Sequence, residues 1–338
     1  MKLSSNWVSF EDFIELLEEN VFQDKSLFHS ESWLMAISKG FNADLKPIKT
    51  CDASGNVIAL TPYVLKKKGP FKLFGAPLRG LYTEFTGSLF IENTKEDIKL
   101  LVLESQSRFL QKAADYIEFG FENGKDSNVQ KVFENMQYNV STRSSSIINL
   151  DVSQDELLKS YTGRARNMIR KSEKLNICVS KVSPYKEWID HYYSILNDTF
   201  IRQGAACPHP LSFFYKLKDL HASGNILFLE ATKEGEFVAG SIFLLDRSRM
   251  VYFSGASNLE GMKSAATSAL QWHAMMFGIN NNFKKYDMGG LGIPSIDKFK
   301  FSFGGEQYWQ DRWIYKSKLF SICEPIAEWA VKKGILRF

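Results

Sequence analysis

Apolar and polar positions in the second half of the chain follow helical and strand-like spacings in a regular order. The stretch 153–175 has a helical pattern, and Ser153 with Glu156 has the spacing of a capping box. Alternating apolar runs within 225–257 predict three strands joined by the polar turns KEGE and DRSR, and KKYDMGG at 284–290 predicts another strand. This half therefore predicts helices packed on a largely antiparallel sheet.

The first half follows a similar order of helices, strands, a long amphipathic helix at 94–116 and further strands. We therefore expect an α+β protein of two similar units, divided into 1–150 and 151–318, although no low-complexity linker marks the boundary. The tail, 319–338, has a helical pattern with Pro325 in its first turn.

Composition narrows the class of protein. Hydrophobic residues make up 44% of the 338 residues and charged residues 24%, which is typical of globular proteins. The net charge of +4 suits an anionic small molecule or a phosphate-bearing partner but is too weak to prove nucleic-acid binding, and no DNA partner is expected. We expect a cytoplasmic protein, because the chain has no signal-peptide or membrane-spanning run and its cysteines lack paired spacing. These are Cys51, Cys178, Cys207 and Cys323.

The stretch YDMGGLGIPSIDKFKFSFGGE, residues 286–306, combines glycine pairs, lysines and aromatic residues. Glycines after a strand let the backbone approach a ligand and present N–H groups, and lysines add positive charge. If residues 298–301 alternate as a strand, Lys298 and Lys300 share one face. The alternative is a tight turn between core strands with a solvated Lys300.

These residues resemble the FemABX-like branch of the GNAT acyltransferase superfamily. The strand followed by Gly-Gly and then by Phe-Lys-x-x-Phe-Gly-Gly is the specific part, and RARNMIRKSEK, the three strands and ALQWHAM support it. The resemblance implies two tandem GNAT-like domains with mixed, mainly antiparallel sheets, and a C-terminal helix 319–338 that packs back on the first. It also implies that Lys300 neutralises a phosphate or the tetrahedral intermediate.

The same resemblance implies a transferase that forms an amide between an activated acyl or aminoacyl donor and an amine. The acceptor would belong to peptidoglycan or surface-polysaccharide biosynthesis, as a nucleotide-sugar or lipid-linked precursor. No covalent enzyme intermediate, bound metal or redox cofactor is expected. Aminoacyl-tRNA or acyl-CoA would be the donor. The resemblance is also compatible with peripheral association of the protein with the inner face of the membrane. The alternatives are an acyl-CoA-dependent N-acetyltransferase and an inactive GNAT-like scaffold protein.

The site residues that this interpretation selects fall in the motif and on one strand before it. Lys300 and Asp287 are the catalytic candidates, although Asp287 is equally suited to capping the turn. Tyr252 is a proton-donor candidate whose alternative is a buried structural tyrosine. The other substrate-binding candidates in the motif are Tyr286, Gly289, Gly290, Lys298, Gly304 and Gly305.

A basic helical segment precedes the three strands. Arg166, Arg170 and Lys174 recur every four residues and so lie on one helix face, close to Arg164. The arginines are candidates for binding a pyrophosphate or a tRNA backbone, and the alternative is an ordinary solvated face.

The loop where acetyl-CoA-dependent relatives hold the pyrophosphate reads Asn258 to Lys263. Asn258, Gly261 and Lys263 are the donor-loop candidates, but only Gly261 fits the relatives' pattern and Glu260 would repel a pyrophosphate. This departure favours an aminoacyl-tRNA or another donor over acetyl-CoA.

Overall fold

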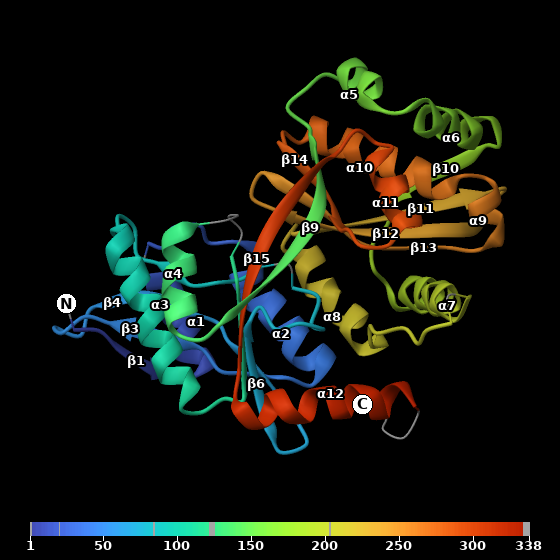
Figure 1. The fold of residues 1–338 in the computed structure, drawn as a ribbon. Helices are drawn as coiled ribbons and strands as arrows, with labels where there is room; N and C mark the ends of the chain where they lie inside the picture. The colour runs from blue at the N-terminus through green and yellow to red at the C-terminus, as the bar shows by residue number, and fades with distance from the viewer. Residues whose placement is uncertain (1, 20, 84, 122–125, 203, 334–338) are drawn as a thin grey trace. The chain divides into compact units, whose positions relative to one another are not determined.

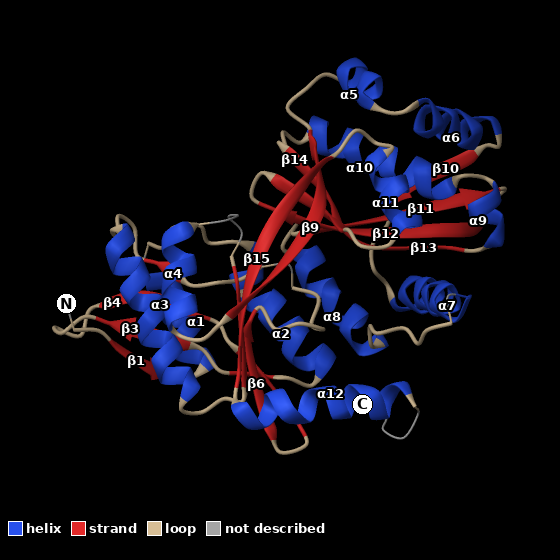
Figure 2. Cartoon of the chain, viewed as in Figure 1, coloured by secondary structure: helices blue, strands red, loops and turns tan. Residues whose placement is uncertain are grey.

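The computed structural model describes residues 2–19, 21–83, 85–121, 126–202 and 204–333, which divide into two compact units. Unit 1 comprises 1–34, 42–142 and 310–338, and unit 2 comprises 35–41 and 143–309. Both units combine helices and strands (Figures 1 and 2), so the chain is an α+β protein, as predicted. Most neighbouring strands are antiparallel, but β13 pairs with β14 and β6 with β8 in parallel.

Unit 1 contains two groups of hydrogen-bonded strands. One has the order β1-β3-β4-β7 and the other β15-β8-β6-β5-β2. The strands are β1 (Ser4–Trp7), β2 (Asp44–Leu45), β3 (Ile48–Cys51), β4 (Val57–Thr61), β5 (Val64–Lys68), β6 (Phe71–Ala76), β7 (Leu89–Phe90), β8 (Tyr116–Gly120) and β15 (Glu306–Lys316). The helices are α1 (Phe10–Glu19), α3 (Glu96–Gln111), α4 (Ser127–Asn135) and α12 (Lys318–Lys332), and α2 (Glu31–Phe41) passes from unit 1 into unit 2.

Unit 2 is built on strands in the order β10-β11-β12-β13-β14-β9. They are β9 (Asn139–Asn149), β10 (Ile177–Lys181), β11 (Ile226–Lys233), β12 (Glu236–Asp246), β13 (Arg249–Ser257) and β14 (Lys285–Gly290). The helices are α5 (Gln154–Ser160), α6 (Gly163–Lys174), α7 (Lys186–Arg202), α8 (Leu211–Ala222), α9 (Leu259–Lys263), α10 (Ala266–Asn280) and α11 (Pro294–Phe301). The predicted strands at 225–257 and 284–290 are confirmed.

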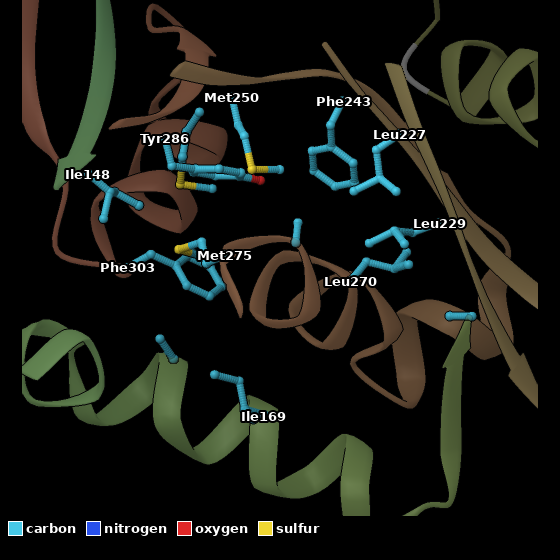
Figure 3. Close-up of a cluster of buried hydrophobic side chains, with 14 of the residues drawn as sticks. Ile148, Ile169, Leu227, Leu229, Phe243, Met250, Leu270, Met275, Tyr286 and Phe303 are labelled. Atoms are coloured by element: carbon cyan, nitrogen blue, oxygen red, sulfur yellow. The ribbon is translucent and has the colours of Figure 1, made fainter. Parts of the chain in front are cut away.

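Alternation along β11 produces the layers of unit 2, because successive strand residues point to opposite faces. Leu227 and Leu229 join the core beneath α6 and α10, which also includes Phe243 and Tyr286 (Figure 3). Phe228 points the other way and meets Trp188 of α7 edge to face, with ring centroids 5.5 Å apart. Helices therefore cover both faces of this sheet, and burial of these side chains is the main term that stabilises it.

Local signals set where the helices of unit 2 begin. The Ser153 side chain accepts the Glu156 N–H while the Glu156 carboxylate accepts the Ser153 N–H, which confirms the capping box at the start of α5. Thr162 caps α6 in a similar way through the Ala165 N–H.

The C-terminal helix α12 begins at Lys318, with Ser317 as its N-cap. Pro325 lies in the middle of this helix, so the prediction that it lies in the first turn is wrong. Residues 334–338 of the predicted helix lie outside the described residues. No helix in the described part of the chain has the length and apolar character needed to cross a membrane.

Candidate functional site

The central feature of unit 2 is the separation of β13 from β14. These parallel strands pair only from Arg249 with Lys285 to Val251 with Asp287. Beyond this point β13 keeps its pairing with β12 through a register shift between Ile242 and Phe243. The end of β14 pairs with β9 instead, where Gly290 faces Ser145. The register between the two strands therefore ends at Val251 and Asp287, and we call this point the fork.

Lys300 reaches this fork from α11. Its Nζ donates a hydrogen bond of 2.6 Å to the Gly290 carbonyl, and only 8% of the residue is exposed. Gly289 has φ +77°, and a Cβ there would lie 3.3 Å from the Tyr252 carbonyl oxygen and 3.6 Å from Lys300 Nζ. Because a buried ammonium is costly without partners, these polar groups position a positive charge beside the end of β14.

Asp287 supports the turn that follows it. Its Oδ1 accepts the Gly289 N–H at 2.8 Å, and its Oδ2 lies 4.0 Å from a guanidinium nitrogen of Arg249. These contacts are those of a turn-stabilising carboxylate, the alternative that the sequence left open. Its catalytic role stays a prediction. Sequence reasoning missed Arg249, because nothing in the sequence DRSRMVY indicates which strand will face it.

The predicted strand-like alternation at 298–301 is wrong, because these residues belong to α11. Pro294 occupies the first turn, and the Asp297 carboxylate accepts the Gly292 N–H at 3.0 and 3.1 Å. Residues two apart on a helix point about 200° from each other. Lys298 is accordingly exposed while Lys300 is buried, and the two do not share a face.

The second glycine pair contacts the chain itself. A Cβ at Gly304 would lie 2.6 Å from Ser160 Oγ, and one at Gly305 would lie 2.1 Å from Ser146 Oγ. Gly304 also has φ +79°. These glycines permit close packing against α5 and β9, whereas at Gly290 the nearest atom to an added Cβ is the Ser144 carbonyl oxygen at 4.0 Å. Gly289 and Gly290 are therefore the pair that lies beside Lys300.

This difference gives a stability prediction. Gly305→Ala should lower the free energy of unfolding by about 2 kcal/mol, because the added methyl group overlaps Ser146. Gly290→Ala, the matched control, should change it by less than about 0.5 kcal/mol, because its site is open. Urea unfolding measures both, and equal effects would contradict the packing role of Gly305.

The two candidate tyrosines lie differently. Tyr286 is fully buried in the core of Figure 3 and its hydroxyl donates to Gln271, while burial raises its pKa well above the usual value. Burial also raises the pKa of Tyr252 to about 12. The Tyr252 hydroxyl lies against Gly255, where a Cβ would be 2.0 Å from it, so the backbone carbonyl of Tyr252 is the group that lies beside Gly289.

The donor-loop candidates form a short helix instead of an open loop. Asn258 is the N-cap of α9, its side chain accepts the Gly261 N–H at 2.8 Å, and Gly261 packs against the Val238 carbonyl. Glu260 pairs with Lys233 at 2.6 Å, and Lys263 is exposed. Backbone N–H groups that already donate within the chain are those of Asn258, Gly261, Met262, Ser264 and Ala265. A pyrophosphate would have to compete with these bonds.

The arginines of α6 divide into two roles. The Arg166 guanidinium donates to the Leu158 and Tyr161 carbonyls, and so satisfies the C-terminal carbonyl groups of α5. Arg164 and Arg170 are exposed, as is Lys174. The predicted arginine face is therefore partly structural, with Arg164 and Arg170 left to meet an anion.

A groove of 640 Å³ lies between α5, α6 and α10. Its cations are Lys159, Arg166 and Arg170, its acids are Asp155 and Glu173, and the half-buried Trp272 contributes an aromatic wall. The mixed charge suits a zwitterionic ligand as well as an anionic one. Within the described ranges no group of His, Cys, Asp and Glu side chains is arranged to hold a metal ion.

Comparisons with known proteins agree with this architecture. Residues 159–309 match the family described as acetyltransferase (GNAT) domain. The structure is similar to that of FemX, with a TM-score of 0.70 at 15% identity, covering 94% of this chain and 98% of FemX. It is also similar to L-PGS from Bacillus licheniformis, with a TM-score of 0.57 at 13% identity, covering 97% and 96% of the two chains.

A tandem GNAT protein from the clavulanic acid biosynthesis pathway has a TM-score of 0.56 at 9% identity, covering 93% of this chain and 98% of its own. No curated protein matches the chain in sequence. The predicted fold of two GNAT-like domains, related to that of FemX, is confirmed.

Proposed function

We propose that this chain, whose residues 159–309 match the acetyltransferase (GNAT) domain family, transfers an activated acyl or aminoacyl group to an amine of a cell-envelope precursor. The observation that carries the proposal is the buried Lys300 ammonium at the fork between β13 and β14. The fold likeness to FemX and L-PGS supports the same class of transferase.

The proposed reaction has two steps, attack of the amine on the donor carbonyl and loss of the leaving group. The neutral amine nitrogen attacks the carbonyl carbon of the donor, a C–N bond forms, and the carbonyl oxygen takes the negative charge. Lys300 lies where a positive charge would stabilise that oxyanion. The C–O or C–S bond to the donor's leaving group then breaks, and the proton lost by the amine is passed to the leaving group or to water.

The positioning of Lys300 depends on the preceding turn. Asp287 fixes Gly289 in its left-handed conformation, and the Gly290 carbonyl then accepts the lysine ammonium. In this proposal Asp287 is a positioning residue for Lys300. The exposed Arg164 and Arg170 would hold an anionic donor or acceptor.

Two donors are compatible with this mechanism. The occupied N–H groups of the α9 segment and the Glu260 carboxylate weigh against the pyrophosphate of acyl-CoA, and so favour an aminoacyl-tRNA donor. The acetyltransferase family match favours acyl-CoA, which therefore remains the second candidate.

A donor screen tests the proposal. The protein is incubated with either aminoacyl-tRNAs or acyl-CoAs and a panel of amines that includes nucleotide-linked and lipid-linked peptidoglycan precursors and amino sugars. We expect mass spectrometry to detect an amide with an aminoacyl-tRNA, and CoA to leave the melting temperature unchanged. Amide formation with acyl-CoA alone would identify the second candidate. No amide with any pair would favour an inactive scaffold protein.

A further inference from the structure

The C-terminal helix α12 has one face that packs firmly on unit 1. Phe320 is buried against the rings of Phe71 and Tyr116, with centroids 5.2 and 5.6 Å away. Phe71 begins β6 and Tyr116 begins β8, so this contact seats the start of the helix on two strands. The opposite face of α12 is consequently directed away from the strands.

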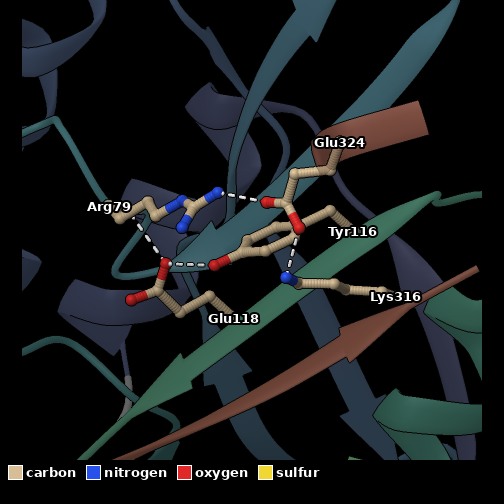
Figure 4. A network of polar contacts seen from close by, with 5 residues as sticks. All are labelled: Arg79, Tyr116, Glu118, Lys316 and Glu324. Atoms are coloured by element: carbon tan, nitrogen blue, oxygen red, sulfur yellow. Dashed lines mark hydrogen bonds and ion pairs between the residues drawn. The ribbon is translucent and has the colours of Figure 1, made fainter. Parts of the chain in front are cut away.

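A polar cluster fixes the rotation of α12 about its own axis (Figure 4). Glu324 accepts a hydrogen bond of 2.6 Å from the Arg79 guanidinium and another from Lys316. The Arg79 backbone N–H in turn donates to Glu118 at 2.9 Å. Because Glu324 follows Phe320 by four residues, both lie on the packed face and hold it inward.

The outward face carries an apolar stripe, defined as Leu319, Ile322, Ile326 and Trp329. These residues are 60%, 66%, 62% and 56% exposed. At 3.6 residues per turn their spacings of three, four and three residues place them within an arc of about 80° on one side of the helix. A continuous exposed stripe of large apolar residues is unusual for a free surface and indicates a docking surface.

Cations lie at both ends of α12 and in a hairpin that packs against its inward face. Lys318 and Lys333 are exposed at the two ends of α12. The basic hairpin, residues 66–72 between β5 and β6, presents exposed Lys67 and Lys72. Phe71 of this hairpin meets Phe320 edge to face, which places the hairpin beside α12 (Figure 1).

We propose that the apolar stripe and the basic hairpin together dock on a lipid surface with anionic headgroups. An amphipathic helix with lysines at its borders and a tryptophan on its apolar face binds in the interfacial layer of a bilayer, and nearby lysines add attraction to anionic lipid. A second copy of the chain is a poorer occupant, because it would bring two sets of lysines together. This inference concerns unit 1 and does not depend on the proposed transferase activity.

Vesicle flotation of the full chain tests the proposal. The wild type should float with phosphatidylcholine vesicles that contain phosphatidylglycerol, and about tenfold less should float with phosphatidylcholine alone or in high salt. Ile322→Ser/Ile326→Ser should reduce binding to anionic vesicles by about tenfold or more. Val21→Ser/Ile201→Ser, at two other exposed apolar positions, is the matched control and should bind as the wild type does.

A second pair of variants separates the charge contribution. Lys67→Gln/Lys72→Gln should weaken binding to anionic vesicles, whereas Lys25→Gln/Lys95→Gln, which removes the same charge elsewhere on unit 1, should not. Absence of wild-type binding, or equal binding by the Ile322/Ile326 variant, would overturn the proposal. A wild-type dimer in sedimentation that this variant dissociates, without vesicle binding, would identify a second copy as the occupant. The Lys300→Met variant should bind vesicles normally, which keeps this test separate from that of the transferase.

Discussion

Replacing Lys300 with methionine will lower the rate of amide formation by about a hundredfold or more, which is the usual cost of losing one group that stabilises an oxyanion. The lysine ammonium is buried at the fork of β13 and β14, where solvent screens its charge weakly. Methionine keeps most of the side-chain volume but has no charge and cannot donate to the Gly290 carbonyl. The measurement is the initial rate with the donor and acceptor that the screen identifies.

Lys298→Met is the matched control, because Lys298 lies on the same helix and is exposed. It should leave the rate within about twofold of the wild type. Circular dichroism of both variants shows whether the overall helix content is retained. A Lys300→Met protein that keeps its fold and its rate would remove the basis for a catalytic Lys300.

Regular elements of the fold could be predicted because their signals are local. The alternation in 225–257 indicates β11, β12 and β13, and the Ser153 and Glu156 pair indicates the start of α5. The helix α11 was missed because residues 298–301 alternate polar and aromatic side chains over too short a run to distinguish helix from strand. Pro294 at its first turn and Asp297 after it were the available helix signals.

The site was predicted less completely because its contacts join distant residues. A glycine pair in a sequence indicates that another group lies close to the backbone, but it does not indicate whether that group is a ligand or part of the chain. Here Gly304 and Gly305 lie against Ser160 and Ser146 of the same chain. Likewise the spacing of Arg166 places it on the basic face of a helix, while the carbonyl groups that it satisfies belong to α5. Only the folded chain shows that Lys300 reaches Gly290.

Replacing Arg312 with methionine will lower the free energy of unfolding by about 3 to 5 kcal/mol, because it leaves a buried carboxylate without its cation. Arg312 on β15 donates to the Glu118 carboxylate on β8 at 2.7 Å and to the Thr83 carbonyl at 3.2 Å. Glu118 is 0% exposed and Arg312 only 4% exposed. Urea unfolding gives the free energy, and hydrogen exchange of β8 and β15 assigns the transition to unit 1.

Two comparisons make this prediction specific to the buried pair. Arg108→Met removes an exposed ion pair with Glu104 of similar length, 2.6 Å, and should cost less than about 0.5 kcal/mol because solvent screens that pair. The double variant Arg312→Met/Glu118→Gln should recover part of the loss, because a neutral amide needs no counter-ion and still accepts the Arg79 N–H and the Tyr116 hydroxyl. If Arg312→Met lowers the free energy of unfolding by no more than Arg108→Met does, the Glu118 carboxylate does not need Arg312 as its counter-ion. The pair would then not hold β15 to β8.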